Sequence, residues 1–489
     1  MSGPSIPLDS PIASLLQDAQ PLSPQTSEGV LKENKNDAGN LPSNHYKERL
    51  SLFRFKLRQM CLPIVRKETD LLARLQARVR TPGRDLYFAW TANLASHTFY
   101  VLMLPLPLWF GASTLARDLI FVLGMGIYVT GFFKDFLCLP RPRSPPLHRI
   151  TMLSYTAHEY GWPSSHSANA TAVTLVLLAT FYDQRSSFSY LQFVTLIGLL
   201  ALYYLSLILG RLYCGMHGFF DILTGMSIGT GVFLFRYFYG VAYDQFLFYS
   251  SRNSSWLGIF ATFFVIIAGH MYLIHIYPEP VDDCPCFDDS VAFVGVLIGI
   301  DIAHYVCVLS NKFTFTNTLH DALRIPFLAD LSILVMLARV VIGIVLVVIW
   351  KSILKPVLFS ILPPLYKLIG VNLPRVNYIS TAHSKTASHQ IRRQSLSNMK
   401  NEPMIPIEDI LKSARQEVDV VGPEDDIDAY ELLDYQLKHP EDKSVSVKIS
   451  GVFRPRYDVE IVGRTIVYAG ISITSVWGFA FATQAMGLT

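Results

Sequence analysis

The sequence has little charge for its length. Only 16% of its 489 residues are charged and the formal net charge is +3, whereas 51% are hydrophobic. So low a charge content is unusual for a soluble globular protein and favours a polytopic membrane protein. The small net charge, with no single basic stripe, argues against nucleic acid as a partner and leaves lipids as the expected partners.

The sequence also lacks the features of a disulfide-rich or metal-binding protein. Its 6 cysteines are scattered, and only Cys284 and Cys286 lie close together along the chain. Their spacing is not that of a zinc site, so we predict no disulfide framework, no metal and no cofactor. The N-terminus has no basic-then-apolar signal peptide, so an internal hydrophobic helix is expected to direct membrane insertion.

The hydrophobic residues gather into stretches long enough to span a bilayer, which takes roughly 20 mostly apolar residues. Candidate spans lie at 88–112, 118–138, 167–184, 190–209, 218–240, 256–277, 290–310 and 330–350, with two more at 354–370 and 464–484. The stretch 354–370 contains Pro356, Pro363 and Pro364 and is expected to be broken or re-entrant. We therefore predict an all-α polytopic membrane bundle with about eight to ten transmembrane helices.

Polar segments divide the chain further. Residues 1–45 are rich in Pro, Ser, Asn and Asp and are expected to form a flexible tail. Residues 46–85 interleave basic and apolar side chains, which predicts an amphipathic helix lying on the membrane surface or on the protein. The other predicted segments are a catalytic helical core at 86–245, additional transmembrane helices at 246–370, a polar, partly disordered loop at 371–463 and a C-terminal transmembrane helix at 464–489.

Three short polar clusters interrupt the early hydrophobic stretches, where polar side chains are costly unless they serve a function. They are Lys134 with Arg141-Pro142 after the second stretch, Pro163-Ser164-Ser165-His166 before the third, and Arg211, His217 and Asp221 between the fourth and fifth. Between the second and third clusters the chain crosses the membrane twice. All three clusters are therefore predicted to meet on one membrane face.

The residue types of these clusters suit a phosphate. Lys134, Arg141 and Arg211 supply three cations, and the two guanidinium groups offer paired donors that match a tetrahedral oxyanion. Ser164 and the backbone N–H groups of Ser165 and the residue after it lie at a predicted helix N-terminus, which adds donors and a positive dipole end. We expect these five residues to bind the phosphate.

The histidines suit phosphoryl transfer through a covalent intermediate. His217 and Asp221 lie four residues apart, so Asp221 can hold the imidazole in the tautomer that attacks phosphorus. His166 is then predicted to protonate the leaving alkoxide and later to take a proton from the water that hydrolyses the phosphohistidine.

The pattern Lys134-x6-Arg141-Pro142, Pro163-Ser164-Ser165-His166 and Arg211-x5-His217-x3-Asp221 resembles the three-part signature of the type 2 phosphatidic acid phosphatase (PAP2) superfamily. The resemblance implies a PAP2-type core of membrane helices with the site at one end, and a phosphatase reaction that is independent of metal. The sequence departs from the usual pattern at Gly210, where serine is common, and at Ser165, where glycine is common.

Ser165 and the strings at 138–142, 159–167 and 213–218 are similar to the fungal dihydrosphingosine 1-phosphate phosphatases. This resemblance implies phosphorylated sphingoid long-chain bases as substrates and the endoplasmic reticulum membrane as the compartment. One alternative is a broader phosphatase of phosphatidate or polyprenyl phosphates. Another is a transporter or lipid-binding scaffold with a relic site, which the hydrophobic stretches after residue 256 would suit. Whether the chain forms a homodimer is left open.

Charges near the short loops predict the orientation, because cytosolic loops carry more Lys and Arg. Arg236, Arg252, Lys312 and Arg324 lie near the face opposite the clusters, whereas the loop 278–290 on the cluster side has no Lys or Arg and several Asp. The clusters are therefore predicted to face the lumen. The basic segment 49–84 conflicts with this rule if 88–112 spans, so either a long segment escapes the rule or 88–112 is a hairpin.

Overall fold

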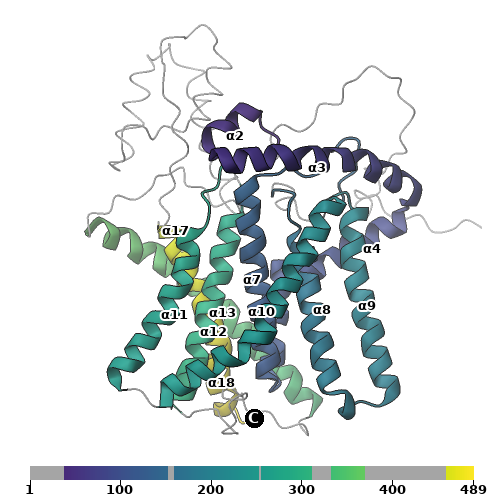
Figure 1. The fold of residues 1–489 in the computed structure, drawn as a ribbon. Coiled ribbons are helices and arrows are strands. Elements are labelled where there is room, and N and C mark those ends of the chain that lie inside the picture. The colour runs from purple at the N-terminus through teal and green to yellow at the C-terminus, as the bar shows by residue number, and fades with distance from the viewer. Residues whose placement is uncertain are drawn as a thin grey trace, which may run out of the picture. The chain divides into compact units, whose positions relative to one another are not determined.

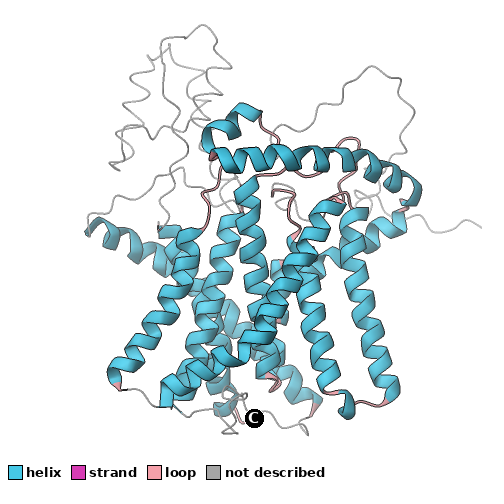
Figure 2. Ribbon diagram, viewed as in Figure 1, coloured by secondary structure: helices cyan, strands magenta, loops and turns pink. Residues whose placement is uncertain are grey.

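The computed structural model describes residues 38–151, 159–252, 255–282, 284–310, 332–368, 457 and 459–488. The chain divides into two units, Met1–Glu33 and Asn34–Thr489, and every described residue lies in the second. All regular structure in these ranges is helical, in agreement with the predicted all-α bundle (Figures 1 and 2). The polar loop predicted at 371–463 lies almost entirely outside the described residues.

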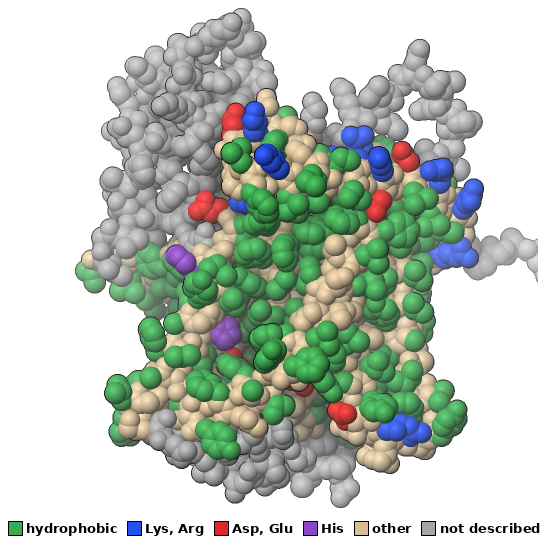
Figure 3. Space-filling view, viewed as in Figure 1, with side chains coloured by type: hydrophobic (Ala, Val, Ile, Leu, Met, Phe, Trp, Pro, Cys, Tyr) green, Lys and Arg blue, Asp and Glu red, His purple; other side chains and the backbone are tan. Residues whose placement is uncertain are grey.

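The long helices run side by side and carry apolar side chains on their outer surface (Figures 1 and 3). They are α7 (Ser113–Leu137), α8 (Ser165–Asp183), α9 (Tyr190–Tyr213), α10 (Phe219–Arg252), α11 (Trp256–Ile276), α12 (Cys286–Ser310), α13 (Ile333–Leu368) and α17 (Val459–Ile473), which η4 (Thr474–Gly478) continues into α18 (Phe479–Ala485). Within the described ranges, 7 stretches are long and apolar enough to cross a membrane. α8 is not among them because its first half is rich in Ser, Ala, Asn and Thr, yet it packs between α7, α9 and α10.

The predicted span 88–112 is not one continuous helix, and in this respect the prediction was wrong. The chain instead forms α4 (Pro82–Ala92), η1 (Asn93–Ala95), α5 (His97–Met103) and α6 (Pro105–Trp109). This broken path runs the length of the bundle, because Asp85 accepts a hydrogen bond from Tyr213 at the end of α9 whereas the ring of Trp109 stacks on Phe479 in α18. The path breaks where Ser96 caps a new helix and Pro105 begins the next. A hairpin is therefore excluded, and the basic segment lies at the same end as the clusters.

Two other predicted boundaries also needed correction. The stretch 354–370 is not a separate broken helix, because α13 runs without interruption through Pro356 and packs along α17. In apolar surroundings a proline removes one hydrogen bond without ending the helix, since the backbone has no water to turn to. At the other end, the predicted tail is packed from residue 38 onward: Ala38 is buried, and the N–H of Gly39 donates to Asp282 at 2.8 Å.

The basic amphipathic segment forms α2 (Ser43–Arg49) and α3 (Leu52–Val79), and α3 lies across the ends of the long helices (Figure 1). Its buried face is mostly polar and contacts the bundle through Arg58, Thr69 and Gln76. Large apolar side chains such as Phe53 and Met60 are exposed. The helix therefore packs on the protein, as one of the two alternatives predicts. That its exposed apolar side chains lie at the membrane interface stays a prediction.

Glycines bring α8 and α10 into close contact. A Cβ atom at Gly225 would lie 2.4 Å from the carbonyl oxygen of Ser164, and one at Gly229 would lie 2.1 Å from that of Ala168. Both distances are impossible for a real side chain, so only glycine allows this approach. Small residues four apart are a common device for packing membrane helices. The contact fixes the start of α8, with the second cluster, against the start of α10, with the third.

Candidate active site

The three clusters lie at one end of the bundle, beneath α3. The first occupies the last turn of α7 and the loop after it, the second the start of α8, and the third the end of α9 and the start of α10. The N–H of Ser164 donates to the carbonyl oxygen of Asp221 at 3.0 Å, which joins the second cluster to the third. The topology inferred from counting membrane crossings is therefore the topology of the structure.

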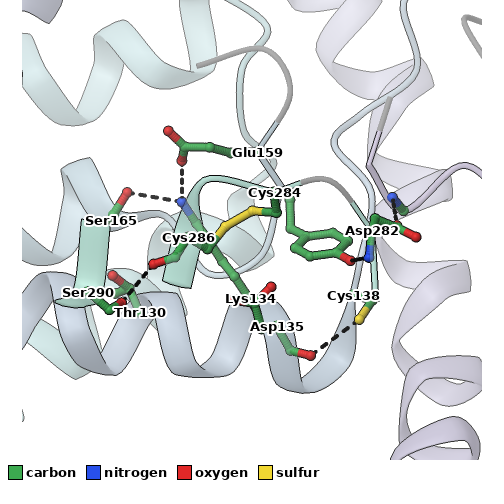
Figure 4. Close-up of a disulfide and its surroundings, with 12 residues drawn as sticks. Thr130, Lys134, Asp135, Cys138, Glu159, Ser165, Asp282, Cys284, Cys286 and Ser290 are labelled. Atoms are coloured by element: carbon green, nitrogen blue, oxygen red, sulfur yellow. Dashed lines mark hydrogen bonds and ion pairs between the residues drawn. A yellow bond between two sulfur atoms is a disulfide. The ribbon is translucent and has the colours of Figure 1, made fainter. Parts of the chain in front are cut away.

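Lys134 and Arg141 share a carboxylate that the sequence analysis did not assign to the site. The Nζ atom of Lys134 lies 2.5 Å from Oε2 of Glu159 and 3.2 Å from Oγ of Ser165 (Figure 4). Nη2 of Arg141 lies 3.7 Å from the same carboxylate oxygen, and all three charged side chains are buried. Burial lowers the pKa of Arg141 to about 10, with neighbouring cations adding to the effect, so Arg141 is still a cation at neutral pH.

Arg141 also touches the candidate nucleophile. It donates through Nε to the carbonyl oxygen of Glu159 at 3.0 Å and through Nη1 to that of Met216 at 2.8 Å. Nη1 lies 3.1 Å from Nε2 of His217. Because arginine has no acceptor, this contact requires a free lone pair on Nε2 and places the proton of the neutral imidazole on Nδ1. The structure thus directs the unprotonated nitrogen of His217 toward a phosphate-binding cation.

His217 and Asp221 face each other as their spacing predicts. Nδ1 of His217 lies 3.6 Å from Oδ2 of Asp221, and both side chains are fully buried. This distance is longer than a hydrogen bond, and Oδ2 instead accepts one from the N–H of Gly218 at 2.9 Å. Burial lowers the pKa of His217 well below its ordinary value, and Arg141 and Lys134 lower it further. His217 is therefore neutral, which is the form that a nucleophilic imidazole needs.

The second cluster lies at the start of α8, and its two serines have different structural roles. Ser164 is the N-cap residue, whose Oγ accepts from the N–H of Ser167 at 3.3 Å, and it is fully buried. It does not line the cavity described below, so its side chain contributes by fixing the helix start. Ser165 and His166 are only half-buried and do line that cavity. Their position in the first turn gives the cavity a positive helix-dipole end.

One cavity contains most of the predicted phosphate ligands. Lys134, Ser165, His166 and Arg211 line it, together with Glu159. Its other wall is formed by small residues of the broken path and by two residues of α12: Ala89, Ala92, Asn93, Ala95, Ser96, Cys286 and Asp289. Arg211 is buried, and its Nε atom has no hydrogen-bond partner among the residues that the structure describes. A buried donor without a partner is costly, so this one fits a ligand. His217 and Arg141 do not line the cavity, but Arg141 lies 3.7 Å from the carboxylate of Glu159, which does.

Residues of α3 position the site, and sequence reasoning missed them. The carboxylate of Glu68 accepts a hydrogen bond from the N–H of Phe220 at 3.0 Å and so caps the start of α10 from another helix. Gln76 donates to the carbonyl oxygens of His148 and Tyr213 at 2.7 and 3.0 Å. The amphipathic pattern of residues 46–85 predicts that one face of this helix is buried, but it does not show which residues of the bundle that face contacts.

The prediction about Cys284 and Cys286 was wrong, because these two residues form a disulfide at the start of α12 (Figure 4). With Asp135 they are also the one group of described residues whose ligand atoms are close enough together to hold a metal, all lying within 4.8 Å of one another. The sulfur–sulfur bond removes both thiolates as ligands. A spacing of two residues does not show whether two cysteines are bonded. The position of this pair next to Asp135 also cannot be read from the sequence, because it arises from the packing of α12 on α7.

Comparison with known proteins identifies the family. The PAP2 superfamily matches residues 115–244, which include most of α7, all of α8 and α9, most of α10 and all three clusters. A dihydrosphingosine 1-phosphate phosphatase of Saccharomyces cerevisiae is 36% identical over 358 residues, which cover 72% of this chain and 82% of the relative. A dihydrosphingosine 1-phosphate phosphatase of Schizosaccharomyces pombe is 40% identical over 322 residues, 65% of this chain and 74% of the relative.

More distant relatives agree. Sphingosine-1-phosphate phosphatase 2 of Homo sapiens is 27% identical over 291 residues, 58% of this chain and 68% of the relative. No solved structure matches the chain. The identity to the two fungal enzymes, over most of their length, carries the assignment: this chain belongs to the dihydrosphingosine 1-phosphate phosphatases of the PAP2 superfamily.

Proposed function

We propose that this membrane protein hydrolyses the phosphate monoester of sphingoid long-chain base 1-phosphates and releases the free base and phosphate. The observation that carries the proposal is the contact between Nε2 of His217 and Nη1 of Arg141 at 3.1 Å, which directs a neutral imidazole at the phosphate-binding cations. The names of the fungal relatives supply the substrate class. The wider set of relatives named as sphingosine-1-phosphate phosphatases supports the same class.

The reaction follows from the roles of the residues. Nε2 of His217 forms a bond to phosphorus while the bond from phosphorus to the lipid oxygen breaks, and His166 gives its proton to that oxygen. Water then attacks phosphorus, His166 takes a proton from it, and the phosphorus–nitrogen bond breaks. Lys134, Arg141 and Arg211 stabilise the charge on the transferring phosphoryl group throughout. Asp221 stabilises the proton on Nδ1.

We further propose that the site faces the lumen of the endoplasmic reticulum. Arg236 gives this orientation less support than the sequence suggests, because it is paired with Asp118 at 2.7 Å and Asp244 at 3.2 Å. Lys312 and Arg324 lie outside the described residues. The stronger support is the segment between α11 and α12, which has no Lys or Arg and carries the disulfide. Disulfides persist in oxidising compartments such as this lumen.

Two activities compete with this proposal. A broader phosphatase would act equally on phosphatidate or polyprenyl phosphates, and a transporter or scaffold would release no phosphate from any lipid. Initial rates on matched sphingoid, glycerolipid and prenyl substrates separate these cases. Homodimer formation stays a prediction that cross-linking in membranes would test.

The direct test is phosphate release from dihydrosphingosine 1-phosphate by the purified protein in EDTA. We expect turnover by the wild type and its loss in His217→Ala, with the variant still inserted in the membrane. His275→Ala is the matched control, because His275 lies on α11, where its ring stacks on Tyr457 at 6.4 Å, away from the cavity. Normal turnover by His217→Ala would contradict the mechanism.

A further inference from the structure

A second cavity lies inside the bundle, and its lining is apolar. It is lined by the later part of the broken path, by α7, by α12 and by α17 with η4. None of the described residues that line it is charged. Its two serine hydroxyls already donate to backbone carbonyl oxygens, Ser472 to that of Val296 at 3.0 Å and Ser475 to that of Ile471 at 2.8 Å. The cavity therefore suits a hydrocarbon group and offers few donors to a polar one.

This apolar cavity begins where the candidate active-site cavity ends. On the broken path Ser96 lines the active-site cavity and Tyr100 lines the apolar one, and the N–H of Tyr100 donates to the carbonyl oxygen of Ser96 at 3.1 Å. On α12 Asp289 lines the first cavity and Phe293 lines the second. Four residues of a helix rise about 6 Å. The two cavities are therefore about one helical turn apart on both elements.

Further contacts join the two cavities. Tyr100 lies within electrostatic reach of Arg211, which is one of the cations of the active-site cavity. On α7, Ile127 lines the active-site cavity and Ile120, two turns earlier on the same helix face, lines the apolar one. The residues of α12 that line the two cavities form one stripe at spacings of three and four: Cys286, Asp289, Phe293, Val296 and Ile300. A polar cavity with cations thus continues into an apolar one along shared helix faces.

A sphingoid base phosphate has the same order of polarity, because it carries its phosphate at one end of a single hydrocarbon chain. We propose that the two cavities together bind the substrate, with the phosphate at Lys134 and Arg211 and a segment of the chain in the apolar cavity. This proposal rests on the proposed function and names the part of the protein that recognises the chain. α12, α17 and η4 lie outside residues 115–244, which match the PAP2 superfamily. The chain site is therefore built largely by elements outside the catalytic core.

The size of the apolar cavity decides which lipids it accepts. Its volume is about 40 Å³, which is room for about three water molecules and so for a segment of one hydrocarbon chain, not for two chains side by side. A bilayer is as apolar as the cavity, so a chain gains little free energy when it leaves the bilayer. The cavity therefore selects by shape, and phosphatidate, which has a second chain close to its phosphate, is disfavoured.

The first test locates the chain directly. His217→Ala, which does not turn the substrate over, is placed in phosphatidylcholine vesicles with dihydrosphingosine 1-phosphate that carries a photoreactive diazirine in the middle of its chain. After illumination, mass spectrometry identifies the labelled residues. We expect label on cavity residues such as Ile300 and Ile471, and we expect an excess of unlabelled dihydrosphingosine 1-phosphate to displace it.

The second test narrows the cavity. Val296→Phe adds volume to the lining and should lower kcat/KM for dihydrosphingosine 1-phosphate by about 5- to 150-fold, the range for overfilling a packed site. An analogue whose chain is too short to reach the cavity should lose less than about twofold, because the new ring does not meet it. The ratio of the two substrates does not depend on the fraction of folded enzyme. Val265→Phe is the matched control, because Val265 is exposed on α11, and it should leave this ratio unchanged.

Three results would overturn the proposal: no label on the cavity residues, label there that unlabelled substrate does not displace, or equal losses on the long and the short substrate in Val296→Phe. Failure of the proposed function is distinguishable, because the wild type would then release no phosphate from dihydrosphingosine 1-phosphate. Failure of the chain site alone leaves this release intact.

Discussion

Replacing Arg141 with lysine keeps the positive charge but removes the fork of donors. In the structure the guanidinium reaches the carbonyl oxygen of Glu159 at 3.0 Å, that of Met216 at 2.8 Å and Nε2 of His217 at 3.1 Å. These acceptors belong to two different segments of the chain. One ammonium group at the end of a flexible stem cannot satisfy all three, so we expect lysine to lose two of the contacts.

Each lost hydrogen bond to a buried charged group is worth about 1.5–3 kcal/mol, so two amount to about 3–6 kcal/mol. If the loss falls on the transition state, kcat/KM decreases by about 150- to 25,000-fold. The assay is the initial rate of phosphate release from dihydrosphingosine 1-phosphate. Arg143→Lys is the control, because that side chain is exposed, and its rate should stay at the wild-type level. An Arg141→Lys variant within threefold of wild type would show that charge alone suffices and would refute the reasoning from geometry.

Three further outcomes are expected. Glu68→Ala removes the cap on the N–H of Phe220 and should lower thermal stability by about 1 kcal/mol; an unchanged Tm would show that α3 does not support α10. Gly229→Val should separate α8 from α10 and lower Tm sharply, whereas Gly231→Val, where a Cβ meets nothing within 4 Å, should not; equal effects would contradict the close-packing argument. Because the folded-state pKa of His217 lies below its ordinary 6.5, the unfolded chain binds more protons below that pH, and stability falls as pH falls. The Tm advantage of wild type over His217→Gln should therefore shrink below pH 6.5, and a constant difference would contradict a neutral buried imidazole.

Much of the site follows from the sequence because its elements are local. Lys134 lies at a helix end, Ser164 before a helix, and His217 and Asp221 one turn apart. Such short-range patterns reveal the residue types of the site and the helix ends that carry them. The count of crossings between the second and third clusters then brings distant segments together. No packing detail was needed for this step.

The missed features depend on contacts between segments far apart in the chain. Glu159 carries no motif of its own and reaches the site only because the loop between α7 and α8 folds back onto the last turn of α7. Glu68 caps α10 across 152 residues. Cys284 and Cys286 are two residues apart, and this spacing does not distinguish a disulfide from two free thiols. The sequence of the broken path at 82–109 is apolar enough and long enough to predict a single helix. Only Ser96, which caps α5, and the prolines indicate where the helix breaks.

The central claim is that His217 becomes covalently phosphorylated. The most direct measurement is acid-labile, base-stable labelling of the purified protein with dihydrosphingosine 1-[32P]phosphate, quenched within the first turnovers and mapped by mass spectrometry. We expect phosphate on Nε2 of His217 in the wild type and no label in His217→Ala. Turnover without label at His217, or label on another residue, would contradict the account.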